Sequence, residues 1–341
     1  MSSNATLAGL RDRDIVFDNG CVGRNIEIET ANPTNYYQVI NAPRDMPRAV
    51  IDAKLFVPLR ATRPVPVVIV VPGSLGVARS HVAHAETLTG LGIAACVIDP
   101  FGTRGVTSTV ANQAQYSFAA SAYDVLATVR TLVRMPEIMS GNIGAQGHSR
   151  GGSAVLTAAM RRFSTPVLGE SLGLHAIYAA YPWCGHQFVD PDVGDTVVHA
   201  VIGDRDEWCL PAQAQGHIQA IRLRGGRATL KIFGGAIHSF DRGTAIETLA
   251  GAAVSPDAPI TYIANDGAMV HPLTDRPDPV MVDYDTFVYA LKAGYGRRGA
   301  RIGSQGDDAL RFRADMVEFW TQTFVGAGVE TGVETAVETR A

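Results

Sequence analysis

The sequence predicts an α/β fold with a mostly parallel central sheet and helices on both faces, and three observations support this. Apolar segments typical of strands alternate with segments of helical periodicity from about residue 49 to residue 235. Several of the apolar segments are hydrophobic throughout, as in strands that are buried on both faces of a sheet. The 35 glycines supply the many tight turns that such an alternation requires.

The first expected strand, at 49–58, alternates apolar and polar residues as a half-buried antiparallel strand does. Two continuous apolar segments at 66–73 and 93–100 predict buried parallel strands, and the segment 81–92 between them predicts a helix. The later elements are expected as a helix at 118–136, a strand at 142–147, a helix at 151–163, strands at 176–183, 196–203 and 228–235, and a helix at 307–324.

The segment 244–305 interrupts this alternation. It contains SPDAP, DRPDP and GYGRRGARIG, which are typical of irregular or cap-like structure. Helical periodicity returns only at residue 307. We therefore expect one domain at 1–326, with 244–305 as an irregular insert or cap before the C-terminal helix. A Val-Glu-Thr repeat then predicts a disordered tail at 327–341.

Composition excludes several classes of protein. Hydrophobic residues make up 46% of the chain and charged residues 18%, which is incompatible with wholesale disorder. A formal net charge of -4 gives no basic surface for a nucleic-acid partner. No segment has the length or hydrophobicity of a membrane span or a signal peptide. We expect a cytoplasmic protein without a membrane partner, and whether it forms a homo-oligomer is left open.

The cysteines and histidines predict no metal site and no cofactor. The four cysteines form no CxxC pair and suit a reducing compartment, and Cys96 is expected as a buried free thiol. His81 and His84 lie three residues apart and are expected on a helix surface, because no histidine–carboxylate cluster has metal-ligand spacing.

The strongest motif is Gly-His-Ser-Arg-Gly at 147–151, which matches G-x-S-x-G. The motif lies between an expected strand and an expected helix, as in the nucleophile turn of the α/β-hydrolase fold. Glycines two residues to either side allow a sharp turn that presents Ser149 at the N-terminus of the helix. Ser149 is therefore the predicted nucleophile; the alternative is a glycine-rich turn with a capping serine.

A serine nucleophile needs a base and an acid that orients the base, and in this fold the chain order is nucleophile, acid, histidine. His238 follows the strand expected at 228–235 and would lie at the carboxyl edge of the sheet, where catalytic groups gather. His199 lies inside an expected strand, His217 on an expected helix surface, and His271 in the insert, which makes it the weaker alternative. His238 is the predicted base.

The acid is expected on the loop that follows the strand at 196–203. This loop offers Asp204 and Asp206. We favour Asp206, because a Gly-x-x-Asp spacing lets the loop turn before it presents the carboxylate. The oxyanion donors are expected to be the backbone N–H groups of Arg150, which follows the nucleophile, and of Ser74 in the loop Gly-Ser-Leu-Gly at 73–76.

With these segments placed, the chain resembles the dienelactone hydrolase family from about residue 49 to residue 241 and in the final helix. The matching stretches are VVIVVPGSLGV, DPFGTRG at 99–105, GHSRGG, the Gly-x-x-Asp loop and GAIHSFDR at 235–242. The enzymes that give the family its name use a cysteine nucleophile and a gating glutamate. Here Ser149 stands at the nucleophile position and Ser74 lies in a loop without glutamate, which resembles the serine-bearing esterase branch.

The resemblance implies hydrolysis of a small-molecule carboxylic ester or lactone through an acyl-enzyme. It also implies that Arg104 and Arg242 bind an anionic group of the substrate; the alternative for Arg104 is a structural ion pair with Asp99 or Asp241. Two further functions stay open: an amidase or peptidase that uses the same three residues, and a hydrolase-fold protein that binds without turnover.

Overall fold

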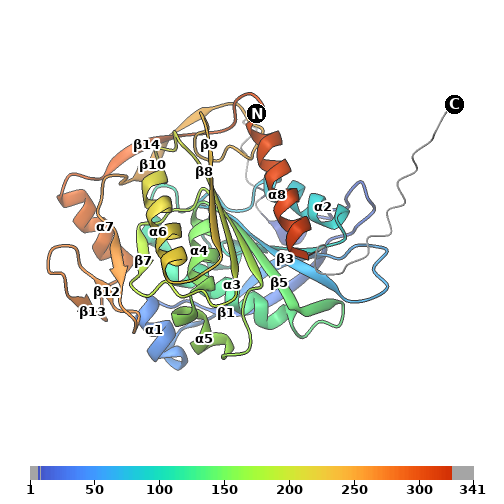
Figure 1. Cartoon of the computed structure of the whole chain (residues 1–341), viewed down its shortest axis with the longest axis horizontal. Helices are drawn as coiled ribbons and strands as arrows, with labels where there is room; N and C mark the ends of the chain where they lie inside the picture. The colour runs from blue at the N-terminus through green and yellow to red at the C-terminus, as the bar shows by residue number, and fades with distance from the viewer. Residues whose placement is uncertain (1–6, 8, 325–341) are drawn as a thin grey trace.

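The computed structural model describes residue 7 and residues 9–324, and its core is one eight-stranded sheet. The sheet lies edge-on near the centre of Figure 1, in the order β1-β2-β4-β3-β5-β6-β8-β9. Its first two strands are antiparallel to their neighbours and the others are parallel, so the predicted α/β fold is confirmed. The strands are β1 (Arg24–Ala31), β2 (Arg48–Phe56), β3 (Val65–Val71), β4 (Ala94–Asp99), β5 (Ile138–His148), β6 (Ala176–Ala180), β8 (Val197–Gly203) and β9 (Ala228–Phe233).

The strand order places a crevice at the carboxyl end of β3. β3 lies between β4 and β5, so the chain leaves β3 toward one side of the sheet and later returns on its other side. The loops after β3 and β5 therefore diverge at a topological switch point, where ligands bind in open α/β sheets. These two loops carry Ser74 and Ser149.

Helices cover both faces of the sheet (Figure 1). One face packs against α3 (Phe118–Leu132), α4 (Arg150–Ala159) and α6 (Pro211–Leu223), and the other against α2 (Arg79–Gly90) and α8 (Asp308–Phe324). The single helix expected at 151–163 is divided in two, because the extended backbone of Met160 separates α4 from α5 (Arg161–Leu168). The short helix α1 (Tyr36–Asn41) precedes β2.

The C-terminal helix packs against the sheet through several buried side chains, and Trp320 makes the closest fit. Trp320 of α8 is fully buried, and a Cβ atom at Gly144 of β5 would lie 2.5 Å from its ring. The Trp320 Nε1–H group donates a 2.9 Å hydrogen bond to Gln146 Oε1 on the same strand. A glycine in the middle of β5 therefore allows α8 to pack closely over the strand that leads to Ser149.

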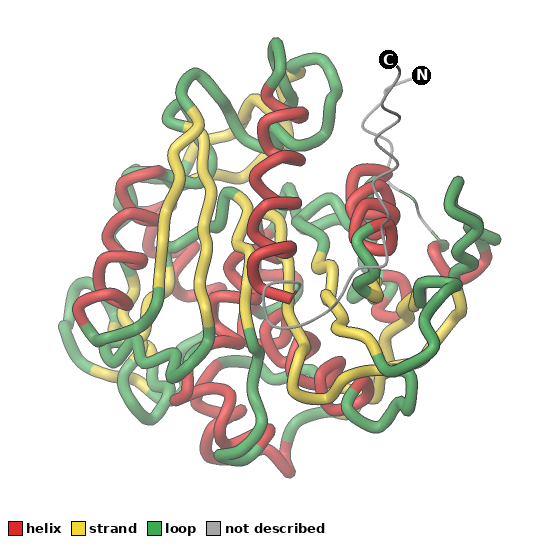
Figure 2. The backbone as a smooth tube through the Cα atoms, turned by 45° about the vertical axis from the view of Figure 1, so that its right-hand side comes forward, coloured by secondary structure: helices red, strands yellow, loops and turns green. Residues whose placement is uncertain are grey.

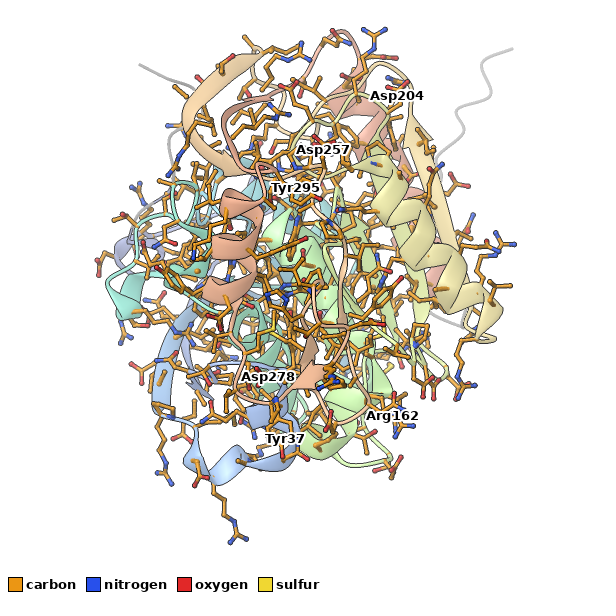
Figure 3. All side chains as sticks on the ribbon, turned by 90° about the vertical axis from the view of Figure 1, so that its left-hand side faces the viewer. Tyr37, Arg162, Asp204, Asp257, Asp278 and Tyr295 are labelled. Atoms are coloured by element: carbon orange, nitrogen blue, oxygen red, sulfur yellow. The ribbon has the colours of Figure 1, made fainter. Side chains whose placement is uncertain are left out.

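The segment 244–305 is more regular than the sequence predicts. β10 (Glu247–Val254) pairs with β14 (Arg297–Ile302), and β11 (Thr261–Ile263), β12 (Met269–Val270) and β13 (Pro277–Asp278) join β7 (His186–Phe188) in a second, four-stranded sheet. Helix α7 (Asp283–Lys292) completes the insert. Figure 2 shows these strands apart from the central sheet, and Figure 3 shows the insert residues Asp257, Asp278 and Tyr295 on one face of the molecule. The tail at 327–341 lies outside the described residues.

Three buried histidines predict a loss of stability in mild acid. Burial lowers the pKa of His148 and His186 to about 3 and that of His217 to about 4. Below about pH 6.5 the unfolded chain binds protons that the folded protein excludes, so each group costs about 1.4 kcal/mol per pH unit. Burial raises the pKa of Asp283 to about 6, so below pH 6 the folded protein binds a proton there that the unfolded chain does not. This contribution cancels the free-energy cost of one of the three histidines.

We expect the free energy of unfolding to fall between about pH 7 and pH 5, because the remaining histidines outweigh Asp283. Urea unfolding monitored by tryptophan fluorescence at several pH values measures this slope. A free energy of unfolding that stays constant over this range would contradict the prediction.

Candidate active site

Ser149 lies on a sharp turn between β5 and α4. Its backbone has φ 55° and ψ -115°, a strained conformation for a residue with a side chain. The flanking glycines are sterically required: a Cβ atom at Gly147 would lie 2.0 Å from the carbonyl oxygen of Gly151, and one at Gly151 would lie 2.4 Å from that of Val71. The G-x-S-x-G spacing therefore reflects backbone packing around the turn.

Gly147→Ala is expected to destabilise the protein by about 2 kcal/mol or more, since the added methyl group meets backbone that cannot move aside. Gly216→Ala is the matched control. Gly216 lies within α6, where a Cβ atom would meet nothing within 4 Å, so alanine is expected to raise stability by up to about 1 kcal/mol. Thermal unfolding of both variants measures the difference; equal unfolding temperatures would contradict it.

Ser149, His238 and Asp206 form a buried hydrogen-bonded chain. His238 Nε2 lies 2.9 Å from Ser149 Oγ, and His238 Nδ1 lies 2.8 Å from Asp206 Oδ2. The other carboxylate oxygen, Asp206 Oδ1, accepts backbone N–H groups of Trp208 and Cys209, both at 2.9 Å. These two donors fix the carboxylate, so its second oxygen faces the imidazole. The chain joins loops that follow β5, β8 and β9.

The structure places the alternative residues elsewhere. Asp204, labelled in Figure 3, is exposed and accepts the backbone N–H of Gly235 at 2.6 Å. His199 contacts Asp315 of α8 and Thr229 of β9, and His271 accepts a backbone N–H within the insert. His217 is buried, contrary to the expected helix surface, because its side of α6 faces the sheet.

A strand of the insert supports the backbone of His238. The carbonyl group of His238 accepts a 3.0 Å hydrogen bond from the N–H of Gly303, and His238 pairs with Ile302 as an isolated parallel bridge. Ser304 Oγ also donates to the carbonyl oxygen of Phe240 at 2.8 Å and accepts the N–H of Gly243 at 2.9 Å. The loop with the imidazole is thus attached to the segment that follows β14.

The two predicted oxyanion donors lie near Ser149: Ser74 lines the same cavities as Ser149, and Arg150 follows it directly in the chain. Arg150 is the first residue of α4, where N–H groups have no partner within the helix. The N–H of Ser74 makes no hydrogen bond within the part of the chain that the structure describes, and a Cβ atom at neighbouring Gly73 would lie 2.9 Å from the carbonyl of His148. Glycine at position 73 therefore lets this loop approach the serine.

The side chain of Arg150 is buried under the same loops, which the sequence did not predict. Its Nε donates to Ser121 Oγ at 3.0 Å, its Nη1 to the carbonyl oxygen of Gln113 at 2.9 Å, and its Nη2 to that of Tyr116. Its guanidinium also lies 4.0 Å from the ring centroid of Phe118. Burial lowers the pKa of Arg150, and neutral acceptors hold its charge near the N-terminus of α4.

Arg104 and Arg242, which the resemblance assigned to the same role in substrate binding, have different surroundings in the structure. Arg104 forms a bidentate ion pair with Asp124 at 2.8 and 2.9 Å and also donates to Asn32 at 2.6 Å, so the predicted role of Arg104 in substrate binding is not supported. Its partner is neither Asp99 nor Asp241. Arg242 is different: its buried Nε and Nη1 atoms have no partner among the described residues, and it lines a cavity with Ser149 and His238.

A buried polar network lies behind His238. Asp241 accepts Tyr181 Oη–H at 2.6 Å and lies 2.9 Å from His84 Nε2 and 3.9 Å from His148 Nε2. Burial alone would raise the pKa of Asp241, but the hydrogen bond with His84 and nearby positive charge hold it below its usual range. Tyr181 also packs edge-on against the His238 ring, with centroids 4.8 Å apart.

The expected surface position of His81 and His84 is therefore wrong: both are buried, because this face of α2 packs over His148. The ligand atoms of His84, His148 and Asp241 all lie within 4.8 Å of one another, close enough to share a metal ion. Sequence spacing could not reveal this group, since its members come from three distant segments. The structure therefore brings together a histidine–carboxylate cluster that sequence spacing did not reveal, and the absence of a metal site stays a prediction.

Two cavities flank Ser149. The first, which we call the aromatic cavity, is walled by the rings of Phe118, Trp183, Trp208 and Phe287. Phe287 comes from α7 of the insert, so the insert forms part of this wall. The second, the arginine cavity, lies on the side of His81, His148 and Arg242. A molecule bound at Ser149 would thus meet an apolar surface on one side and a cation on the other.

The sheet order, the strained serine turn and the Ser-His-Asp hydrogen bonds together define an α/β-hydrolase fold. The family model of the dienelactone hydrolase family matches residues 51–257. The chain therefore belongs to the dienelactone hydrolase family and is a hydrolase, which confirms the resemblance seen in the sequence.

Solved structures with a similar fold include a dienelactone hydrolase described as putative from Klebsiella pneumoniae, with 18% identity, a TM-score of 0.47, and coverage of 64% of this chain and 89% of that one. A dienelactone hydrolase-like promiscuous phosphotriesterase from metagenomic libraries has 15% identity and a TM-score of 0.47, covering 80% and 95%. Est1E from Butyrivibrio proteoclasticus has 18% identity and a TM-score of 0.42, covering 55% and 86%. No curated protein matched the chain.

None of the helices in the described residues is long and apolar enough to cross a membrane.

Proposed function

We propose that this protein hydrolyses carboxylic esters or lactones through an acyl-enzyme on Ser149. The observation that carries the proposal is the continuous hydrogen-bonded chain from Ser149 Oγ through His238 to Asp206. A serine hydroxyl is a weak nucleophile until a base accepts its proton, and the carboxylate holds the base in the tautomer that can do so.

The reaction would proceed in two halves. Ser149 Oγ attacks the ester carbonyl while His238 Nε2 takes its proton, and His238 then returns the proton to the departing alkoxide. Water, activated by the same imidazole, releases the acid. The N–H groups of Ser74 and Arg150 would donate to the oxyanion in both halves, and the buried guanidinium of Arg150 adds positive charge beneath them.

The ester function is tested with pairs of substrates that differ only in an ester or an amide bond. We expect turnover of the ester and at most slow turnover of the amide, because the alkoxide leaves more readily than the amine. Purified protein that hydrolyses neither member of any pair would contradict the proposal. Faster hydrolysis of the amides would favour the amidase alternative.

Arg242 supports a preference for a substrate with an anionic group. Its Nε and Nη1 atoms are buried beside the arginine cavity without an acceptor among the described residues. A buried donor without a partner is costly, and a carboxylate that enters this cavity could accept a charge-assisted hydrogen bond from one of these nitrogens. The proposed substrate therefore carries its anionic group on the side of Ser149 that faces Arg242.

Arg242→Gln is expected to raise KM for an ester with a carboxylate group by about tenfold or more, since a charge-assisted hydrogen bond is lost. The neutral methyl ester of the same compound should be hydrolysed with nearly unchanged KM. Arg222→Gln, an exposed change at the end of α6, is the control. Steady-state kinetics on both esters separates the effects. An unchanged KM for the anionic ester in folded Arg242→Gln would exclude this role.

A further inference from the structure

The orientation of the Gln113 side-chain amide is fixed by its neighbours. Gln113 is buried at the start of a short 3₁₀ helix (Gln113–Gln115). Its Oε1 atom accepts from Arg150 Nη1 at 3.2 Å and from Ser74 Oγ at 3.1 Å. A guanidinium group can only donate, so the oxygen of the amide must face Arg150. The amino group, Nε2, therefore lies on the opposite side.

The Nε2 atom of Gln113 is a donor without an acceptor among residues 7 and 9–324. Every side-chain hydrogen bond of Gln113 in the described part of the chain uses Oε1. Gln113 lines the aromatic cavity together with Ser149, whereas it does not line the arginine cavity. Its oxygen is held by Ser74 and Arg150, which line the same cavity, so the amino group is the end of the Gln113 side chain that is free to donate.

The remaining walls of this cavity are aromatic and ordered by mutual packing. Phe118 and Trp183 stack with ring centroids 4.5 Å apart and planes 29° apart, and Phe287 also stacks with Trp183, with centroids 6.4 Å apart. Trp208 packs against His238, with centroids 4.9 Å apart. In this structure the walls enclose only about 20 Å³, so a planar apolar group would enter by parting these rings and would then stack on them or meet them edge to face.

We propose that Gln113 is a specificity-determining residue of this site. The aromatic cavity accepts a ring-bearing part of the ester, and Gln113 Nε2 donates a hydrogen bond to an oxygen acceptor on that ring. The substrate class is thus an ester of an aromatic acid or of a phenol whose ring carries a carbonyl or similar acceptor. This inference rests on the proposed ester hydrolysis at Ser149.

The test compares esters with and without the acceptor. Ethyl phenylacetate and phenyl acetate are each paired with their 3-acetyl and 4-acetyl ring derivatives, so that the ring lies in the acyl or in the alcohol part. The readout is the ratio of kcat/KM for the acetyl compound to that for its parent, measured in each protein. Dividing the ratio of a variant by that of the wild type cancels the electronic effect of the acetyl group on the reaction.

Gln113→Glu keeps the shape and the oxygen that faces Arg150 but replaces the donor by an acceptor. Gln113→Met removes the donor without adding charge. We expect both variants to lower the ratio by about tenfold for at least one acetyl position, because one hydrogen bond to the substrate is lost. Gln115→Glu, at the exposed end of the same 3₁₀ helix, should leave the ratio unchanged.

A ratio that is unchanged in folded Gln113→Glu would overturn the proposal. A ratio that falls in Gln113→Glu but not in Gln113→Met would also overturn it, since the added charge and not the lost donor would be the cause. If Gln113→Met does not fold, the wild-type ratios are used instead. Wild-type kcat/KM ratios that do not exceed one for either acetyl position would exclude a donor role for Gln113. Wild-type protein that hydrolyses none of these esters or those of the preceding section would refute the proposed function itself.

Discussion

Ser149→Ala is expected to reduce kcat for ester hydrolysis by a factor on the order of 10⁶, because the hydroxyl that forms the proposed acyl-enzyme is removed. A fluorophosphonate probe should label the wild-type protein at a single site and should not label Ser149→Ala. Intact mass spectrometry of the labelled protein, followed by peptide mapping, measures both the stoichiometry and the position.

Ser153→Ala is the matched control for this experiment. Ser153 is also buried, lies one helical turn further along α4, and donates to the carbonyl oxygen of Trp183 at 2.6 Å. Its replacement should leave labelling at Ser149 in place. Labelling that persists in Ser149→Ala would identify another nucleophile. A folded wild-type protein that is never labelled would instead favour a binding protein without turnover.

Asp206→Asn is expected to lower kcat by about 10⁴-fold. The N–H groups of Trp208 and Cys209 donate to Oδ1, so the oxygen of the new amide must take that place. The NH₂ group then faces His238 Nδ1 and donates to it, which leaves the proton of the imidazole on Nε2. In this tautomer His238 cannot accept the proton of Ser149.

Asp204→Asn distinguishes the two acids of the loop. Asp204 Oδ1 accepts the N–H of Gly235, and an asparagine oxygen can accept it equally well. We therefore expect kcat to change by no more than a few-fold. Steady-state kinetics over a range of pH compares the variants. Loss of activity in Asp204→Asn with retention in Asp206→Asn would reverse the assignment of the acid.

Much of the central sheet and its site could be predicted from the sequence because both depend on local patterns. Buried parallel strands are hydrophobic throughout, so β3 and β4 are visible as apolar segments. The turn at Ser149 requires glycine on both sides, and this requirement is visible in the sequence as the short motif G-x-S-x-G. His238 and Asp206 follow strands of the sheet, and the carboxyl ends of parallel strands lie at one edge.

The features that could not be predicted depend on contacts between distant segments. β12 and β13 contain two residues each, too few to show any periodicity. Arg104 lies after β4, but its orientation toward Asp124 is set by the packing of α3 against the sheet. His84 has no local feature that distinguishes it from a surface histidine, and only the docking of α2 brings it to Asp241.

The attachment of Ile302 and Gly303 to the backbone of His238 links the insert to the position of the His238 imidazole. Changes in the insert can therefore affect both the substrate range and the position of this side chain. The insert forms part of the wall of the aromatic cavity through Phe287 and Val254, so exchanging it is an obvious way to alter substrate range. Yet the end of its last strand also holds the backbone of His238, the proposed base. Insertions and deletions in this segment are therefore tolerated best between β10 and β14, whereas a change in register at 302–304 would misalign the base for every substrate.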